Sequence, residues 1–292
     1  MNSDASFRGD NPAVISISSH VVRGTVGNRA AAFALEVLGY PVWSVPTVTL
    51  PWHPGHGPGR RIVPPAEDFA TMMDELAASP WLHEVGAVMT GYFGAPDQIA
   101  PTVRLIEAVR EKNPMALILC DPATADAGRL YQPRETLEAI RDQLLPISSL
   151  ATPNRFELEF LSGLELADNA ELVEAASALG PQIVVVTSAF PMLRGGTGNL
   201  LVGDRETILA EHRMIENAPK GVGDLTSAVL LARLLGGASM EKALQSTTAT
   251  VFELLARTAK RGADELTLET DIDSLKHPMA MVQMRRLAKV GV

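Results

Sequence analysis

The sequence has few of the features that mark secreted or membrane proteins. Its one cysteine, Cys120, excludes an internal disulfide and favours a reducing compartment. No unbroken apolar run reaches the length that a bilayer requires. Residues 1–11 are polar and lack the basic and then apolar order of a signal peptide. We therefore expect a cytoplasmic protein without a membrane partner.

Basic residues are also in the minority. The chain has 25 Lys and Arg residues against 34 Asp and Glu residues, a net charge of −9, and its basic residues form no cluster. Nucleic acid is therefore not an expected partner. With 292 residues, 46% of them hydrophobic and 20% charged, the chain can bury a sizeable core. It shows neither an internal repeat nor a dividing linker, so we expect a flexible segment over 1–12 and a single domain over 13–292.

Short apolar runs alternate with longer helical patterns along most of the chain. Strands are expected at 14–17, 42–45, 85–89, 115–120, 149–151 and 183–187, with an antiparallel pair at 199–202 and 207–210. Helices are expected at 28–38, 66–78, 96–112, 134–145, 154–161, 169–179, 223–235, 239–259 and 278–287. This alternation predicts an α/β fold, a three-layer α/β/α sandwich with a mainly parallel central sheet.

Polar side chains follow several of the predicted strands. In parallel α/β sheets, ligands bind at the carboxyl ends of the strands, so these side chains are candidates for one shared site. The groups are Ser19, Tyr92 after Thr90-Gly91, Asp121, Thr152 with Asn154 and Glu157, and Thr187.

The segment Gly221-Val222-Gly223-Asp224 precedes a strong helix pattern. Glycines let backbone N–H groups converge on one point, and a helix N-terminus adds partial positive charge, which together favour an anion. A carboxylate beside a resting phosphate would repel it, so Asp224 indicates proton abstraction. Its alternative role is an acidic first-turn residue that favours the helix dipole. The paired glycines favour catalysis, which makes the chain a candidate kinase of a small hydroxyl compound.

Some of these residues also have purely structural interpretations. Asn154 and Glu157 have the spacing of a capping box. This spacing favours two interpretations equally: capping of the helix alone, and capping combined with metal or phosphate binding. Asp121 precedes Pro122 and, taken alone, favours a turn start. His53 and His56 lie in the Pro- and Gly-rich segment 51–59, which is typical of a flexible lid or binding loop and not of a metal pair.

Together these groups resemble the pyridoxal kinases of the ribokinase-like superfamily. The most specific part is the block from Ser18 to Ala31, SSHVVRGTVGNRAA, which is similar to the N-terminal signature of that family. The other motifs follow in the order of the family, and the resemblance extends from about Val14 to the end of the chain. The superfamily also contains hydroxymethylpyrimidine kinases, but the Ser-His-Val-Val-Arg-Gly block favours the vitamin B6 branch.

The resemblance implies phosphoryl transfer from ATP to the 5′-hydroxymethyl group of a vitamin B6 ring. Asp224 would be the base, and Gly221, Val222 and Gly223 would donate N–H groups to the transferring phosphoryl. Ser19, Tyr92 and His53 would hold the pyridine ring. The nucleotide side would comprise Asp121, Asp126, Tyr131, Thr152, Asn154, Glu157 and Thr187, with Asp121 and Glu157 near Mg²⁺ partly through water. The resemblance also implies a homodimer, and a monovalent cation such as K⁺ is a further candidate.

Two segments depart from the pattern of the family. Ala125 stands where the family usually has glycine after Asp-Pro. On the ring side, Leu50-Pro51-Trp52-His53-Pro54 replaces a phenylalanine followed by Ser-Asn-His-Thr. The histidine is kept, and we predict that Trp52 supplies the missing ring face by stacking. The alternatives are a kinase of hydroxymethylpyrimidine or another B6-like ring alcohol, and a non-catalytic B6 carrier or sensor.

Overall fold

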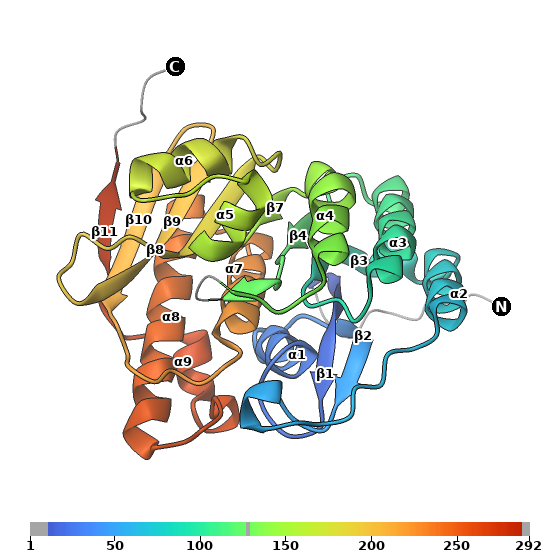
Figure 1. Cartoon of the computed structure of the whole chain (residues 1–292), viewed down its shortest axis with the longest axis horizontal. Coiled ribbons are helices and arrows are strands. Elements are labelled where there is room, and N and C mark those ends of the chain that lie inside the picture. Colours follow the sequence, from blue (N-terminus) through green and yellow to red (C-terminus); the bar gives the residue numbers. More distant parts are fainter. Residues whose placement is uncertain (1–10, 127–128, 288–292) are drawn as a thin grey trace.

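A nine-stranded sheet forms the centre of the molecule. The computed structural model describes residues 11–126 and 129–287, and the strand order is β11-β10-β9-β8-β7-β4-β3-β1-β2 (Figure 1). Six strands run parallel: β1 Ala13–Val21, β2 Val42–Leu50, β3 Val85–Thr90, β4 Leu117–Cys120, β7 Leu150–Ala151 and β8 Ile183–Ala189. The last three pair antiparallel: β9 Gly196–Gly203, β10 Thr207–Arg213 and β11 Gln283–Arg286. A separate two-stranded ladder joins β5 Ala125–Asp126 to β6 Arg129–Leu130.

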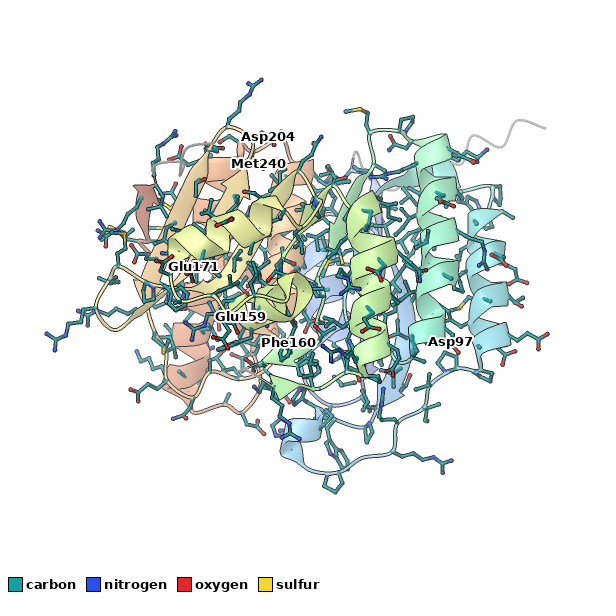
Figure 2. All side chains as sticks on the ribbon, turned by 45° about the horizontal axis from the view of Figure 1, so that its top comes forward. Asp97, Glu159, Phe160, Glu171, Asp204 and Met240 are labelled. Atoms are coloured by element: carbon teal, nitrogen blue, oxygen red, sulfur yellow. The ribbon has the colours of Figure 1, made fainter. Side chains whose placement is uncertain are left out.

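Helices cover both faces of this sheet (Figure 1). One layer contains α1 Asn28–Val37, α7 Val222–Leu235 and α8 Met240–Arg261. The other contains α2 Ala66–Ala77, α3 Ile99–Lys112, α4 Arg134–Ala139, α5 Arg155–Ser162 and α6 Asn169–Ser177. Figure 2 shows this second layer, with Glu159 and Phe160 on α5 and Glu171 on α6. The predicted three-layer α/β/α sandwich is confirmed.

The two-residue period of a strand divides the core between these layers. On β1, Val14 packs with the α1–α7 layer, whereas Ile15 and Ile17 pack with α2 and α3. Both faces are therefore apolar, which is why the parallel strands appear in the sequence as continuous hydrophobic runs.

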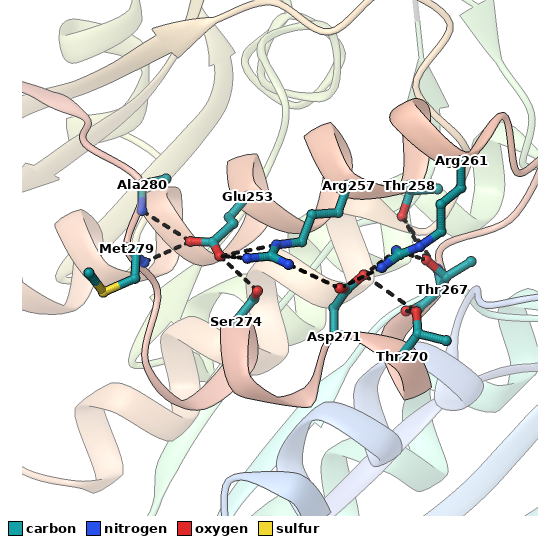
Figure 3. Close-up of polar contacts among 10 residues, drawn as sticks. All are labelled: Glu253, Arg257, Thr258, Arg261, Thr267, Thr270, Asp271, Ser274, Met279 and Ala280. Carbon is teal, nitrogen blue, oxygen red and sulfur yellow. Dashed lines mark hydrogen bonds and ion pairs between the residues drawn. The ribbon is translucent and has the colours of Figure 1, made fainter.

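The predicted helix at 278–287 is wrong. Residues 283–286 form β11, the edge strand that pairs with β10. In Figure 3, the carboxylate of Glu253 on α8 accepts the N–H groups of Met279 (2.7 Å) and Ala280 (3.0 Å) and the hydroxyl of Ser274 (2.8 Å). These bonds anchor the segment between α9 (Ile272–Lys276) and β11 to the side of α8. The backbone N–H groups of this segment thus bond to Glu253 and to β10 instead of forming the hydrogen bonds of a helix.

The antiparallel pair is confirmed as β9 and β10. The first two strands are longer than the expected 14–17 and 42–45, since β1 ends at Val21 and β2 at Leu50, and α4 ends at Ala139 and continues as a π-helical turn over Ile140–Leu144. The segment 51–59 contains one 3-10 turn, Pro54–His56. Within the described parts of the chain, no helix has the combined length and apolar composition needed to cross a membrane. The expected flexible segment over 1–12 lies outside the described residues except for Asn11 and Pro12.

Candidate active site

The carboxyl ends of the parallel strands meet the N-terminus of α7. A methyl group built on Gly91, directly after β3, would lie 3.8 Å from Asp224 Oδ1. A methyl group on Gly223 would lie 3.9 Å from Oδ2 of Asp121, directly after β4. The fold therefore brings together the glycine turn and the polar residues that follow the strands.

The turn before α7 requires glycine. Gly221 has a φ of 92° and occupies the N-cap position of α7. A side chain there would place a Cβ only 1.9 Å from the carbonyl oxygen of Thr25. Gly27, with a φ of 56°, is equally confined, because its Cβ would lie 2.3 Å from Ser19 Oγ. The loop that follows β1 thus packs directly on the glycine turn.

Asp224 lies in the first turn of α7, where solvent reaches only part of its side chain. Its carboxylate accepts the backbone N–H of Gly27 as well as its own. Burial raises the pKa of this carboxyl to about 6, although both hydrogen bonds act in the opposite direction. A carboxylate with such a pKa is ionised at neutral pH and basic enough to take a proton from a hydroxyl.

Glu157 and Asn154 do form the capping box of α5. Glu157 accepts the N–H groups of Thr124 (2.7 Å) and Ala125 (3.3 Å) with Oε1 and that of Asn154 (2.8 Å) with Oε2. The Asn154 side chain caps the helix in return and donates to the carbonyl of Ala125 (2.8 Å). Burial raises the pKa of Glu157 to about 7 despite these donors. The pair therefore joins the segment after β4 to the segment after β7.

The site contains an excess of buried negative charge. Burial raises the pKa of Asp121, and the charges of Glu157 and Asp224 raise it further. No group of three or more His, Cys, Asp or Glu among the described residues could hold a metal ion unaided. Asp121 and Glu157 suit a divalent cation of the magnesium type, which binds through one or two carboxylates while phosphates and water complete its shell. Such a cation would offset the burial of these carboxylates, which is the main cause of their raised pKa values, and the repulsion between Asp121 and its two acidic neighbours.

Ser227 belongs to this site and was not anticipated from the sequence. Its hydroxyl donates to Asp121 Oδ2 at 2.7 Å and lies 2.7 Å from the hydroxyl of Thr152. Because the single hydroxyl proton of Ser227 is used in the bond to Asp121, the Thr152 hydroxyl donates to Ser227. Ser227 lies one turn after Asp224 on α7, and this i, i+3 spacing was the available signal.

Two residues expected on different sides of the reaction lie face to face. Tyr92, expected against the ring, and Tyr131, expected at the nucleotide, stack with centroids 6.3 Å apart and an interplanar angle of 16°. Arg61 donates to the Tyr92 hydroxyl (3.1 Å) and to the Gly94 carbonyl (3.1 Å). No pattern in the sequence indicates this role of Arg61. Tyr92 thus lies where the two expected subsites meet.

Residues 51–60, expected on the ring side and called the ring-side loop below, are held by hydrogen bonds within the loop. Trp52 Nε1 donates to the carbonyl of Gly57 (3.1 Å), and His53 Nδ1 accepts the N–H of Gly55 (3.0 Å). Burial lowers the pKa of His53, and the charge of Lys220 lowers it further. The loop therefore faces the residue that precedes the glycine turn.

Among the residues expected to bind the nucleotide, Asp126 pairs through its carboxylate with Lys220 Nζ at 3.0 Å. Thr187 donates its backbone N–H to Pro153 (2.9 Å) and lies beside Asn154. Ala125 does not need the freedom of the glycine usual at this position, because Ala123, with a φ of 43°, is the left-handed residue of this stretch.

Comparison with known proteins identifies the family. The phosphomethylpyrimidine kinase family model matches residues 83–269. Pyridoxal kinase PdxY of Rubrobacter xylanophilus is 36% identical over 282 residues, which cover 94% of this chain and 97% of that protein. The chain belongs to the pyridoxal kinase family. Pyridoxal kinase PdxY of Corynebacterium diphtheriae, another similar member, is 29% identical over 94% of this chain and 99% of its own length.

Solved pyridoxal kinases share the fold as well. The enzyme from Leishmania donovani, in complex with ADP and pyridoxamine, aligns with a TM-score of 0.89 at 30% identity, covering 95% of this chain and 100% of that one. The enzyme from Entamoeba histolytica aligns with a TM-score of 0.87 at 26% identity over the same shares. As a pyridoxal kinase family member, the chain is an ATP-dependent kinase, and such kinases use a divalent metal cofactor.

Proposed function

We propose that this protein transfers the γ-phosphoryl group of ATP to the 5′-hydroxymethyl oxygen of pyridoxal and so forms pyridoxal 5′-phosphate. The observation that carries the proposal is the position of Asp224. Asp224 places a carboxylate with a pKa of about 6 beside the glycine turn of α7, at the carboxyl ends of the parallel strands, where a ligand would bind. The likeness to pyridoxal kinases over nearly the whole chain supports pyridoxal as the acceptor.

In this proposal Asp224 takes the proton from the 5′-hydroxyl group as the hydroxyl oxygen attacks the γ-phosphorus of ATP. The bond between the γ-phosphorus and the β–γ bridging oxygen breaks, and ADP leaves. The backbone N–H groups of Gly221, Val222 and Gly223 stabilise the charge on the transferring phosphoryl. Ser19 and Tyr92 orient the pyridine ring, and the loop with Trp52 and His53 closes over it.

The nucleotide would bind on the other side of Asp121. We assign it the following residues: Asp121, Asp126, Tyr131, Thr152, Asn154, Glu157, Thr187, Gly221 and Gly223. We propose Mg²⁺ as the divalent ion, held by Asp121 and Glu157 partly through water, where it would offset phosphate charge. K⁺ is a candidate for an additional monovalent ion. We further propose a cytoplasmic homodimer.

A second candidate is a kinase of hydroxymethylpyrimidine or another B6-like ring alcohol. It is favoured by the description of the matching family model and by the altered Trp52 loop. A non-catalytic B6 carrier is less consistent with the structure, because a carrier has no use for a base beside a glycine turn.

One assay separates these functions. The protein is incubated with Mg²⁺-ATP and, separately, with pyridoxal, pyridoxine, pyridoxamine and hydroxymethylpyrimidine, and the products are identified by mass. Pyridoxal 5′-phosphate formed with ADP supports the proposal. Phosphorylation of the pyrimidine alone would establish the second candidate. Ligand retention without ATP consumption would indicate a carrier. Trp52→Ala tests the ring-stacking role, which is wrong if pyridoxal affinity and turnover stay unchanged.

A further inference from the structure

Glu265 joins the two loops that border the ring side of the site. It follows α8, and its side chain is only 13% exposed. Oε1 lies 2.7 Å from His56 Nε2, and Oε2 accepts the N–H of Thr25 at 3.1 Å. We call Glu265, Thr25 and His56 the Glu265 clasp. Its members come from three distant parts of the chain.

The first of these loops, residues 24–27, connects Glu265 with Asp224, the proposed catalytic base. Gly24, with a φ of 116°, lies so close to the carboxylate that a Cβ would come within 2.6 Å of Oε1. The carbonyl of Thr25 packs on Gly221, and the N–H of Gly27 donates to Asp224. Glu265 therefore holds the far end of a short, glycine-constrained loop whose near end contacts the catalytic carboxylate.

The second loop contains Trp52 and His53, and the clasp holds it through His56. The carbonyl of Pro51 accepts the N–H of Arg23 (2.9 Å), so the two loops also meet at the base of the ring-side loop. Beyond the loop, Arg61 is bonded to Tyr92 and Gly94. The His56 contact lies between these two attachments, at the 3-10 turn near the tip. The contact therefore holds residues 52–60 near their middle, between the attachments at the two ends.

Exposed ion pairs usually contribute little, because solvent screens them and the long side chains lose entropy. The neighbouring pair of Arg23 and Asp264 is of this kind, with side chains 55% and 61% exposed. The Glu265 carboxylate differs because it is mostly buried and already oriented by the Thr25 N–H. A charge-assisted hydrogen bond to such a group is stronger and better directed.

We propose that His56 and Glu265 are positioning residues for the ring substrate, which hold the Trp52–His53 loop closed over the pocket. The proposal rests on the proposed function, since it concerns how the same site binds its ring alcohol. Neither residue needs to touch the reacting atoms. The hydrogen bonds of the clasp hold the ring-side loops, and Thr25 also packs on Gly221 through its carbonyl. His56 lies on the Trp52–His53 loop, so its replacement is expected to affect the ring substrate more than the nucleotide.

The kinetic test compares His56→Ala, His56→Gln and Asp74→Asn with the parent protein; Asp74→Asn removes the exposed Arg104–Asp74 ion pair between α2 and α3 and serves as the control. We expect His56→Ala to raise the KM for pyridoxal about tenfold, because a lost hydrogen bond to a charged group has an effect of at least that order. The KM for ATP and kcat should change less than about twofold. His56→Gln keeps an N–H donor and should restore most of the affinity. Asp74→Asn should match the parent. An unchanged KM for pyridoxal in His56→Ala, or an equal rise in the KM for ATP, would overturn the proposal.

Hydrogen exchange tests the clasp without relying on activity. Amides in residues 51–60 of the ligand-free protein should exchange about tenfold faster in His56→Ala than in Asp74→Asn, because the loop opens more often. Equal exchange in the two variants would refute the clasp. A parent protein that phosphorylates no B6 vitamer would refute the proposed function and leave the exchange result to decide on the clasp. A parent that phosphorylates pyridoxal, with no effect of His56→Ala, would refute the clasp alone.

Discussion

Replacing Asp224 with asparagine is expected to abolish catalysis and to stabilise the fold. The pKa of this carboxyl is raised from its ordinary value of 3.8 to about 6, with burial as the largest cause. Above that pH the folded protein must keep a poorly solvated charge, whereas the unfolded chain solvates it fully. The raised folded-state pKa means that this group favours folding only when protonated. Its contribution to stability is therefore present at low pH and lost as the pH rises through about 6.

The size of the effect follows from the shift. A difference of about 2 pKa units corresponds to about 3 kcal/mol at pH 8, as an upper limit. Solvent still reaches part of the side chain, so we expect about 1–2 kcal/mol, or a Tm about 2–4 °C higher in the variant. An asparagine oxygen can still accept the N–H of Gly27, so the local geometry should persist. The variant lacks a base, and kcat at pH 8 should fall by about a hundredfold or more.

The assay measures kcat and urea unfolding for the parent and for Asp224→Asn at pH 8 and pH 5. The stability difference should shrink at pH 5, where the parent carboxyl becomes protonated, and kcat/KM of the parent should decline below about pH 6. Asp97→Asn, an equal charge change at an exposed position (Figure 2), serves as the control and should leave both quantities unchanged. A variant that is less stable than the parent at pH 8 would contradict the burial argument, and retained turnover would refute the base.

Three other perturbations test separate parts of the structure. Ser227→Ala removes the hydroxyl that orients Asp121, so the KM for the nucleotide should rise about tenfold while that for pyridoxal is unchanged; equal changes in both would contradict this role. Ala123→Gly relieves a left-handed backbone conformation, so its urea midpoint should equal or exceed that of the parent, whereas Ala125→Gly in β5 should lower the free energy of unfolding by about 0.5–1 kcal/mol. The reverse order of stability would contradict these backbone conformations. Glu253→Gln should lower the free energy of unfolding by about 2 kcal/mol at pH 7, and a neutral effect would show that its hydrogen bonds do not hold the C-terminal segment. Burial alone would raise the pKa of Glu253, but the groups that donate hydrogen bonds to its carboxylate lower this pKa overall. Glu253 should therefore stabilise the fold above the ordinary pKa of a glutamate, and this stabilisation should be lost as the pH falls through the lowered pKa.

Residues whose role depends on their own segment were predicted well. The turn before Asp224 was identified because two glycines and a following apolar run indicate a helix N-terminus wherever they occur. The capping pair of Asn154 and Glu157 was recognised for the same reason, since its partners are three residues apart. The predicted roles of these residues in substrate and metal binding stay predictions.

Residues whose role depends on distant partners were missed. Ser227 and Arg61 look like ordinary surface or helix residues until the fold places Asp121 and Tyr92 beside them. The segment that became β11 was assigned to a helix because its pairing partner β10 and its anchor Glu253 are remote in sequence. The local sequence pattern does not show which edge of the sheet is free to pair with a further strand.

The sequence by itself determined the alternation of strands and helices, the glycine turn and the family, because hydrophobic period and backbone freedom are properties of neighbouring residues. Only the tertiary structure decided the raised pKa values of Asp224 and Glu157, since burial and like charges depend on segments that meet after folding. It also decided that Glu265 reaches His56 across more than 200 residues of chain. The spacing of residues along the chain does not predict such contacts, because they form only when the layers of the fold pack together.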